Sequence, residues 1–170
     1  MMQIQLKDLA SKGQPVHITA DLNLTSPFEG RQDILGYSPI HVDLHAKHEG
    51  GAAKVNGTLT FNVELSCSRC LSQFKQTIEL PFEEVFTQKL DEESEDDEDI
   101  HLVTEDKVDL EPYVVENIIV GLPLIPLCGE ACKGLCPVCG TNRNEHDCGC
   151  KQDKIDPRLA GLADFFNQEQ

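Results

Sequence analysis

Eight cysteines occur along this chain in four close pairs, and their spacing restricts the fold more than any other feature. The pairs are Cys67-x2-Cys70, Cys128-x3-Cys132, Cys136-x2-Cys139 and Cys148-x-Cys150. Two thiolates so close in sequence can reach one Zn²⁺ ion from a single tight turn, and structural zinc takes four such ligands tetrahedrally. The four pairs therefore predict two separate four-cysteine zinc sites.

A disulfide framework, or a set of free thiols, is the alternative use of these cysteines. Disulfide frameworks are typical of secreted chains that are too small to bury a core. This chain has 170 residues and is 39% hydrophobic, so it can bury a core without cross-links. Its first residues, MMQIQLKDLASKG, lack the apolar run of a signal peptide. Its most apolar stretch, 118–127, is about half the length that a membrane span needs. We therefore expect a cytoplasmic, zinc-binding protein with no membrane segment.

Separation along the chain indicates how the pairs combine. The last four cysteines are close enough to form one site locally, where Gly140 and Gly149 give the backbone freedom to turn toward sulfur. The predicted local site is Cys136, Cys139, Cys148 and Cys150. The predicted long-range site is Cys67, Cys70, Cys128 and Cys132, which closes a loop of about sixty residues. Sulfur saturates both sites, whereas catalytic zinc keeps a position open for water, so we expect two structural Zn²⁺ ions.

Other residues near the cysteines leave alternatives open. Arg69, Lys133 and Arg143 lie in or beside the pairs, either as ordinary exposed bases or as cations that offset the negative charge of zinc thiolates. His146 lies within the second cluster and is a candidate substitute ligand. A redox couple is the rival interpretation of Cys67 and Cys70. Redox CxxC motifs usually open a helix after a strand, whereas strands are predicted on both sides here.

Alternation of apolar and polar residues predicts strands at 16–21 and 40–47 and one long hairpin over 53–86. In the hairpin, Cys67-Ser68-Arg69-Cys70 replaces the usual turn, as a zinc knuckle would. Residues 26–38 contain a proline and two glycines and predict a loop.

Two helices are predicted in the second half of the chain. The main one covers about 110–122, with Asp109 as its N-cap, an apolar face that includes Ile119, and an end set by Gly121 and Pro123. A short terminal helix begins at Asp156. The predicted fold is α+β: an antiparallel sheet, with barrel-like closure left open, that carries one main helix and a C-terminal zinc-bound segment. We place a β-rich domain at 1–127 and the zinc-binding segment at 128–170.

The net charge of −16 limits the classes of partner. Eight acidic residues lie in the run 91–99 (DEESEDDED), so the remainder of the chain carries −8. The run predicts a solvated loop, with a docking site for a basic partner as the alternative. A protein with this net negative charge repels the phosphate backbone of RNA. We therefore expect direct RNA binding to be weak or absent and a basic protein to be the partner.

The remaining polar residues give no sign of an active site. His41 and His45 share the polar face of a predicted strand with Asp43, so we interpret them and His48 as solvated surface residues. The sequence has no nucleophile–base signature, phosphate-binding loop or paired-acid motif. We therefore expect a protein that is not an enzyme and has no small-molecule substrate.

The chain resembles the YceD family, the large ribosomal RNA subunit accumulation proteins. The resemblance rests on CSRC at a strand end, an acidic segment, VDLEPYVVENIIVGLPLIPLC and CKGLCPVCGTNRNEHDCGC, and it covers about residue 53 onward. It implies support of large-subunit ribosomal RNA accumulation and ribosome assembly, with a basic ribosomal protein or a pre-ribosomal particle as partner. Some relatives keep only the counterpart of the first quartet, which supports the pairing above. A thiol- and zinc-dependent redox chaperone or regulatory protein remains the alternative function.

Overall fold

The structure is a computed structural model that describes residues 2–89 and 100–151. The predicted acidic loop 91–99 and the predicted terminal helix lie outside these residues. Backbone contacts divide the chain into two compact units. The first comprises Met1–Ser68 and Ser72–Cys128 and holds the sheet and the helices, and the second comprises Arg69–Leu71 and Gly129–Gln170.

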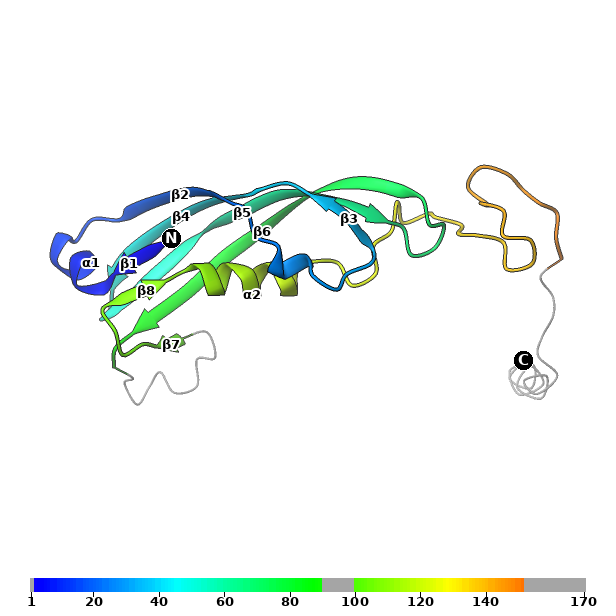
Figure 1. Ribbon diagram of the computed structural model, residues 1–170. Helices are drawn as coiled ribbons and strands as arrows, with labels where there is room; N and C mark the ends of the chain where they lie inside the picture. The colour runs from blue at the N-terminus through cyan, green and yellow to red at the C-terminus, as the bar shows by residue number, and fades with distance from the viewer. Residues whose placement is uncertain (1, 90–99, 152–170) are drawn as a thin grey trace, which may run out of the picture. The chain divides into compact units, whose positions relative to one another are not determined.

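The first unit is built on a six-stranded sheet (Figure 1). Its strands are β2 (Val16–Leu22), β3 (Ile34–Tyr37), β4 (Ile40–Glu49), β5 (Ala52–Ser66), β6 (Gln73–Thr87) and β7 (Ile100–Leu102). They follow the order β2-β4-β5-β6-β7, and β3 pairs with β5. The α+β class is confirmed. The sheet is mixed, however, because β7 runs parallel to β6, and among the described strands it stays open between β2 and β7, so barrel-like closure is wrong.

The long hairpin of β5 and β6 follows the predicted alternation closely. Leu59 pairs with Leu80 and Phe61 with Ile78, so apolar residues of both strands share the inner face. The predicted loop 26–38 is only partly a loop, because it contains a 3₁₀ turn, η1 (Ser26–Phe28), and strand β3. Strand β3 is too short to show a period, and it pairs with β5 through a register shift between Ile34 and Gly36.

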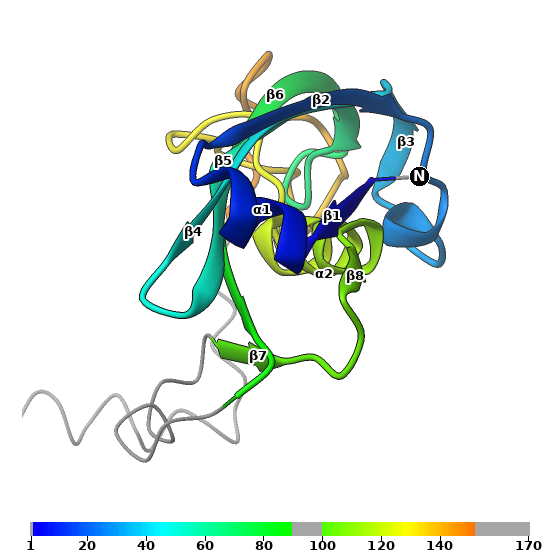
Figure 2. The same ribbon diagram turned by 90° about the vertical axis from the view of Figure 1, so that its left-hand side faces the viewer.

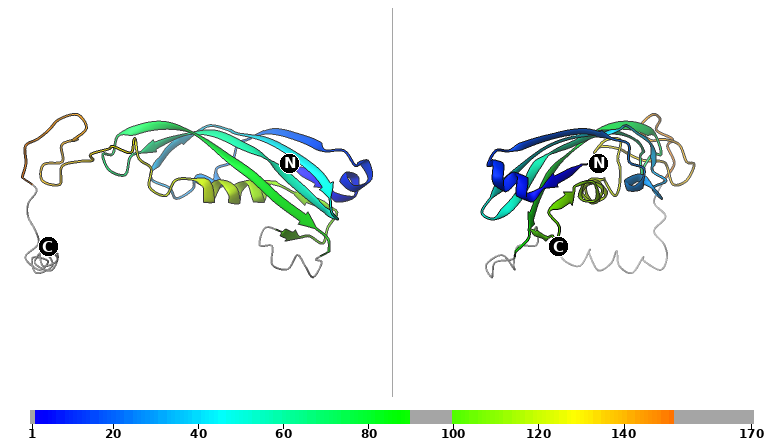
Figure 3. Two further views of the ribbon diagram at one scale, coloured as in Figure 1. Left: turned by 180° about the vertical axis from the view of Figure 1, so that it is seen from behind. Right: turned by 60° about the vertical axis from the view of Figure 1, so that its left-hand side comes forward.

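The main helix α2 (Glu111–Gly121) lies under the curved sheet (Figures 2 and 3). Its N-cap residue is Leu110, one residue later than predicted, although Asp109 Oδ1 still accepts a hydrogen bond from the Glu111 amide at 3.1 Å. Val114 and Ile118 are buried as expected. Ile119 is 51% exposed, so the predicted width of the apolar face is wrong at that residue.

The alternation did not predict two elements of the N-terminal segment, β1 (Gln3–Gln5) and α1 (Leu6–Lys12), nor the short strand β8 (Lys107–Asp109) just before α2. β1 and β8 pair antiparallel, which places the start of the chain beside the start of α2. Leu6 and Leu9 of α1 are buried in the core formed by the inner face of the sheet and α2. Over the described residues, every helix is too short or too polar to cross a bilayer.

Candidate metal centres

The first CxxC motif forms the turn between β5 and β6. The Cys67 amide donates a hydrogen bond to the Ser72 carbonyl at 2.9 Å, and Leu71 closes the turn with a left-handed φ of 60°. The Ser68 amide donates to the Pro126 carbonyl at 2.9 Å, which holds the extended segment after α2 against the turn. Strands flank the motif on both sides, unlike the strand-to-helix setting of a redox CxxC.

The second CxxC motif repeats this geometry within the second unit. The Cys136 amide donates to the Thr141 carbonyl at 2.8 Å, and Gly140 has a φ of 74°. An antiparallel bridge joins Leu135 to Asn142 and closes the turn. Both motifs therefore present two sulfurs from a turn held by an amide-to-carbonyl bond five residues apart, with a left-handed residue directly after the second cysteine.

The sulfur atoms come together in two quartets, and within each quartet they all lie within 4.8 Å of one another. The quartets are Cys67, Cys70, Cys128 and Cys132, and Cys136, Cys139, Cys148 and Cys150. A tetrahedral zinc ion with Zn–S bonds of about 2.3 Å holds its sulfurs about 3.8 Å apart. Both quartets thus fit a metal ion after small side-chain adjustments. These are the groupings that the spacing predicted, and zinc as the bound ion stays a prediction.

The electrostatics of the second quartet also suit a cation. Cys139 Sγ and Thr141 Oγ1 lie 3.2 Å apart and share a hydrogen bond, which with the Thr141 backbone amide and the Cys136 thiol lowers the pKa of Cys139 to about 6. Hydrogen bonding with the Cys148 and Cys139 thiols raises the pKa of Cys150 to about 12. The thiols of this quartet lie close enough to shift one another's pKa values, and a bound divalent ion would offset the charge of four thiolates.

An asparagine that the sequence reasoning missed supports the first quartet. Asn144 Nδ2 donates to Cys132 Sγ at 3.4 Å, and Asn144 Oδ1 accepts from the Lys133 amide at 2.8 Å. Amide donors of this kind offset thiolate charge in zinc–sulfur sites. Arg69 donates to the Cys132 carbonyl at 3.2 Å, so this predicted cation holds the backbone beside the ligand. The polar spacer between the third and last cysteine pairs, which contains Asn144, was the available signal for such a residue.

The structure places both the histidines that the sequence singled out and one that it did not. His41, His45 and His48 are exposed as predicted, and the predicted substitute ligand His146 is not among the groups of ligand atoms found over the described residues. The pairing of β2 with β4 places His17, which the sequence reasoning left aside, directly opposite His45.

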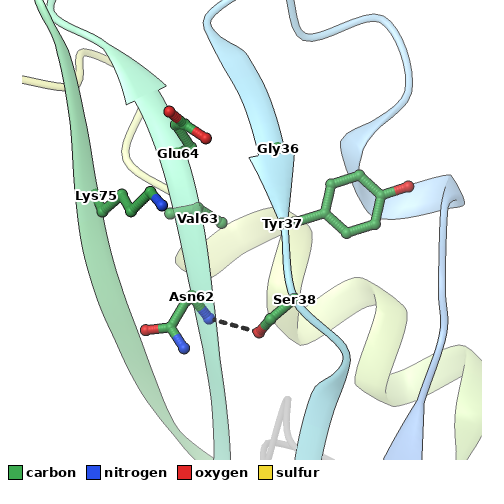
Figure 4. Close-up of a pocket in the computed structure, with 7 residues that line it drawn as sticks. All are labelled: Gly36, Tyr37, Ser38, Asn62, Val63, Glu64 and Lys75. Atoms are coloured by element: carbon green, nitrogen blue, oxygen red, sulfur yellow. Dashed lines mark hydrogen bonds between the residues drawn. The ribbon is translucent and has the colours of Figure 1, made fainter.

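A pocket lies where β3 meets β5, beside the hairpin. Its lining residues are Gly36, Tyr37, Ser38, Asn62, Val63, Glu64 and Lys75 (Figure 4). Ser38 Oγ accepts a hydrogen bond from the Asn62 amide at 2.9 Å, and Glu64 is the cross-strand neighbour of Lys75. The lining offers a few polar groups and no pairing of a nucleophile with a base, so it gives no support for a small-molecule reaction.

The chain is similar to several known proteins. A family model described as "Large ribosomal RNA subunit accumulation protein YceD" matches residues 55–166, more than half of the chain. An uncharacterized protein of Mycobacterium bovis is 30% identical over 133 residues, which cover 76% of this chain and 63% of that protein. The chain thus spans less than two thirds of that relative's length.

Two further relatives extend the comparison. The uncharacterized protein YlbN of Bacillus subtilis is 28% identical over 166 residues, 97% of this chain and 95% of that protein. An Arabidopsis thaliana protein named "Large ribosomal RNA subunit accumulation protein YCED homolog 1, chloroplastic" is 26% identical over 161 residues, 78% of this chain and 50% of its own. No solved structure gives a significant match.

Proposed function

Because this chain belongs to the YceD family, we propose that it is a non-enzymatic factor that supports accumulation of large-subunit ribosomal RNA during ribosome assembly. The names of the plant relatives support this role. We place its action in the cytoplasm, where thiols stay reduced and available to metal. Its partner in this proposal is a basic protein of the large subunit or a pre-ribosomal particle.

The observation that carries the choice of partner is charge. The chain has a formal net charge of −16. Each zinc ion with four thiolates contributes −2, so the loaded protein would carry about −20. On the outer face of β6, the exposed residues include Glu79 and Glu83. A protein of this charge repels the phosphate backbone of RNA and attracts the basic proteins that bind it.

In this proposal the two metal ions are structural zinc. Four sulfurs in each quartet match the ligand set of structural zinc sites and leave no position for a reactive water. The first ion fixes the hairpin turn to the segment after α2, and the second fixes the turn that begins at Cys136. Neither ion takes part in a reaction, which is consistent with a protein that acts by binding.

Capture from a bacterial lysate tests the partner. The tagged, zinc-loaded full chain is used as bait at low and high salt, with and without ribonuclease, and the bound protein and RNA are identified. We expect a basic large-subunit protein that is retained after ribonuclease treatment and released by salt. The matched control is a bait in which the acids of 91–99 are replaced by Asn and Gln, which separates that run from the rest of the surface. A tight complex of the purified chain with naked ribosomal RNA would overturn the charge argument.

A depletion strain tests the assembly role independently of the partner. Loss of the protein should lower the ratio of large-subunit to small-subunit ribosomal RNA, and wild-type protein should restore it. An unchanged ratio rejects the role. The rival redox chaperone is tested on the purified protein: we expect both zinc equivalents to survive mild peroxide, whereas release of zinc with exposure of apolar surface would favour the rival.

A further inference from the structure

The outer face of β2 and β4 carries a second kind of ligand cluster. The register of this antiparallel pair sets His17 directly opposite His45, and Asp43 lies two residues before His45 on the same strand. Residues two apart on a strand point to one face, and directly opposite residues have their Cβ atoms about 4.5–5.5 Å apart. The alternate residues of β4 are buried in the core, so these three side chains converge on the outer face.

The distances show that the three side chains already gather around one point. His17 Nε2 lies 2.7 Å from Asp43 Oδ1, and His45 Nδ1 lies 4.0 Å from the same oxygen. The two imidazole rings stack with centroids 4.4 Å apart and planes 13° apart. One ligand atom from each side chain lies within 4.8 Å of the other two. Ligands at about 2.1 Å from a shared ion stand about 3.4 Å apart, so these side chains must close by about an ångström. At least one imidazole must also turn out of the stacked arrangement for both nitrogens to face the ion.

The chemistry of the cluster selects a type of ion. Two imidazole nitrogens with one carboxylate suit divalent transition metals such as Zn²⁺ and Ni²⁺, whereas Mg²⁺ and Ca²⁺ prefer oxygen ligands. Three protein ligands leave at least one position for water or for a group from a partner. The side chains of His17, Asp43 and His45 are 53%, 46% and 55% exposed, so an ion can enter and leave. The sulfur quartets, by contrast, are saturated.

We propose that His17, Asp43 and His45 bind a third, exchangeable divalent transition-metal ion on the outer face of the sheet. The neighbouring pair of His41 and Asp21, 2.8 Å apart across the same two strands, lies outside this group of three ligand atoms. The proposal does not depend on the assembly role or on zinc in the quartets, because none of its ligands is a cysteine.

Calorimetric titration with Zn²⁺ tests the site on the full chain after its two tight equivalents are loaded. We expect one additional equivalent in the wild type. His17→Ala and His45→Ala should each weaken this binding by more than about tenfold, since changes even beyond the direct ligands cost about that much. Asp43→Asn, which keeps the size of the side chain and removes its charge, should act in the same direction.

His48→Ala is the matched control, because His48 is an exposed histidine of the same strand that lies outside the cluster. It should bind the additional ion as tightly as the wild type does. The imidazole NMR resonances of His17 and His45 should shift together on addition of Zn²⁺, while those of His48 stay in place. Absence of an additional equivalent in the wild type, equal binding by His17→Ala, or equal weakening by His48→Ala would each overturn the proposal. The two tight equivalents should persist in every variant.

Discussion

Replacing Cys70 by Ser should destabilise the sheet far more than replacing Cys148 by Ser. Cys70 is 5% exposed and belongs to the quartet that joins two cysteine pairs distant in sequence. Cys148 belongs to the quartet that closes within its own segment. A metal that joins distant segments restricts the unfolded chain more than a metal that joins neighbours, so its loss should lower the free energy of unfolding more.

The loop-closure relation gives the size of the two effects when each metal is treated as a cross-link. The loop between Cys70 and Cys128 has about 58 residues and corresponds to about 4 kcal/mol. The loop between Cys139 and Cys148 has about 9 residues and corresponds to about 2.5 kcal/mol. Domains are typically stable by about 5–15 kcal/mol, so loss of the first cross-link removes a large share of that stability. Loss of the second cross-link should destabilise only the segment that this metal closes, not the sheet.

Guanidinium unfolding followed by far-ultraviolet circular dichroism measures the free energy of the sheet, and elemental analysis counts the zinc. Both variants should retain one zinc per chain. Cys70→Ser should lower the free energy of unfolding of the sheet by about 4 kcal/mol, and Cys148→Ser should change it by less than about 0.5 kcal/mol. Ser68→Ala and Val138→Ala, exposed positions in the two CxxC turns, are matched controls that should keep both zincs and full stability.

Two outcomes would refute this reasoning. Equal losses of sheet stability in the two variants would mean that the cysteines are paired wrongly. The second outcome concerns the metal-free proteins: after chelation, the wild type and Cys70→Ser should be equally stable. If the variant is still about 4 kcal/mol less stable, the effect comes from packing at Cys70 and not from a metal cross-link.

Three further predictions concern the packing of β4 against β5, the first CxxC turn and the ion pair of Arg31 with Asp33. Gly57→Ala would place a Cβ atom 2.0 Å from the backbone oxygen of Asp43, so we expect a loss of about 3 kcal/mol or more in urea unfolding, and a near-neutral effect would contradict the close approach of β4 and β5. Leu71→Gly relieves a left-handed φ of 60° and should raise the free energy of unfolding by about 1 kcal/mol, whereas a loss would mean that the side chain contributes more than the strain. The hydrogen bond from Arg31 lowers the pKa of Asp33, so its stabilisation is present above the unfolded-state pKa of about 3.9 and is lost as the pH falls through the lower folded-state value. After metal is removed by chelation, the free energy of unfolding should fall less for Asp33→Asn than for the wild type as the pH is lowered from 5 into the acid range. Equal falls in the two proteins would contradict this prediction.

The long elements were predictable because they extend over enough residues to show a period. Strands β4, β5 and β6 and helix α2 lie within a few residues of their predicted bounds. The short strands β1, β3, β7 and β8 have three or four residues each and cannot establish an alternation. Their place in the fold depends on which partner offers an unpaired edge, and that is decided by tertiary structure.

The same distinction holds at the candidate sites. Cysteine spacing reports the geometry of a turn directly, so both quartets could be grouped from sequence. Asn144 reaches Cys132 only because the backbone of the second unit folds back between them, and His17 meets His45 only through the register of β2 and β4. Contacts of this kind depend on three-dimensional pairing and leave no spacing pattern along the chain.

The two CxxC turns share one hydrogen bond but differ at the residue with left-handed φ, which is Leu71 in the first and Gly140 in the second. A left-handed conformation costs about 1–2 kcal/mol for a residue with a Cβ atom and almost nothing for glycine. Leu71 is 63% exposed, so burial of its side chain offsets little of that strain. The first turn tolerates it because β5 and β6, paired from Ser66 and Gln73 onward, hold both of its ends, whereas only a single bridge closes the second. The paired strands thus set the first turn without metal, so its ion should contribute mainly by joining the segment after α2 to the hairpin. In the second turn glycine and metal together should set the local fold.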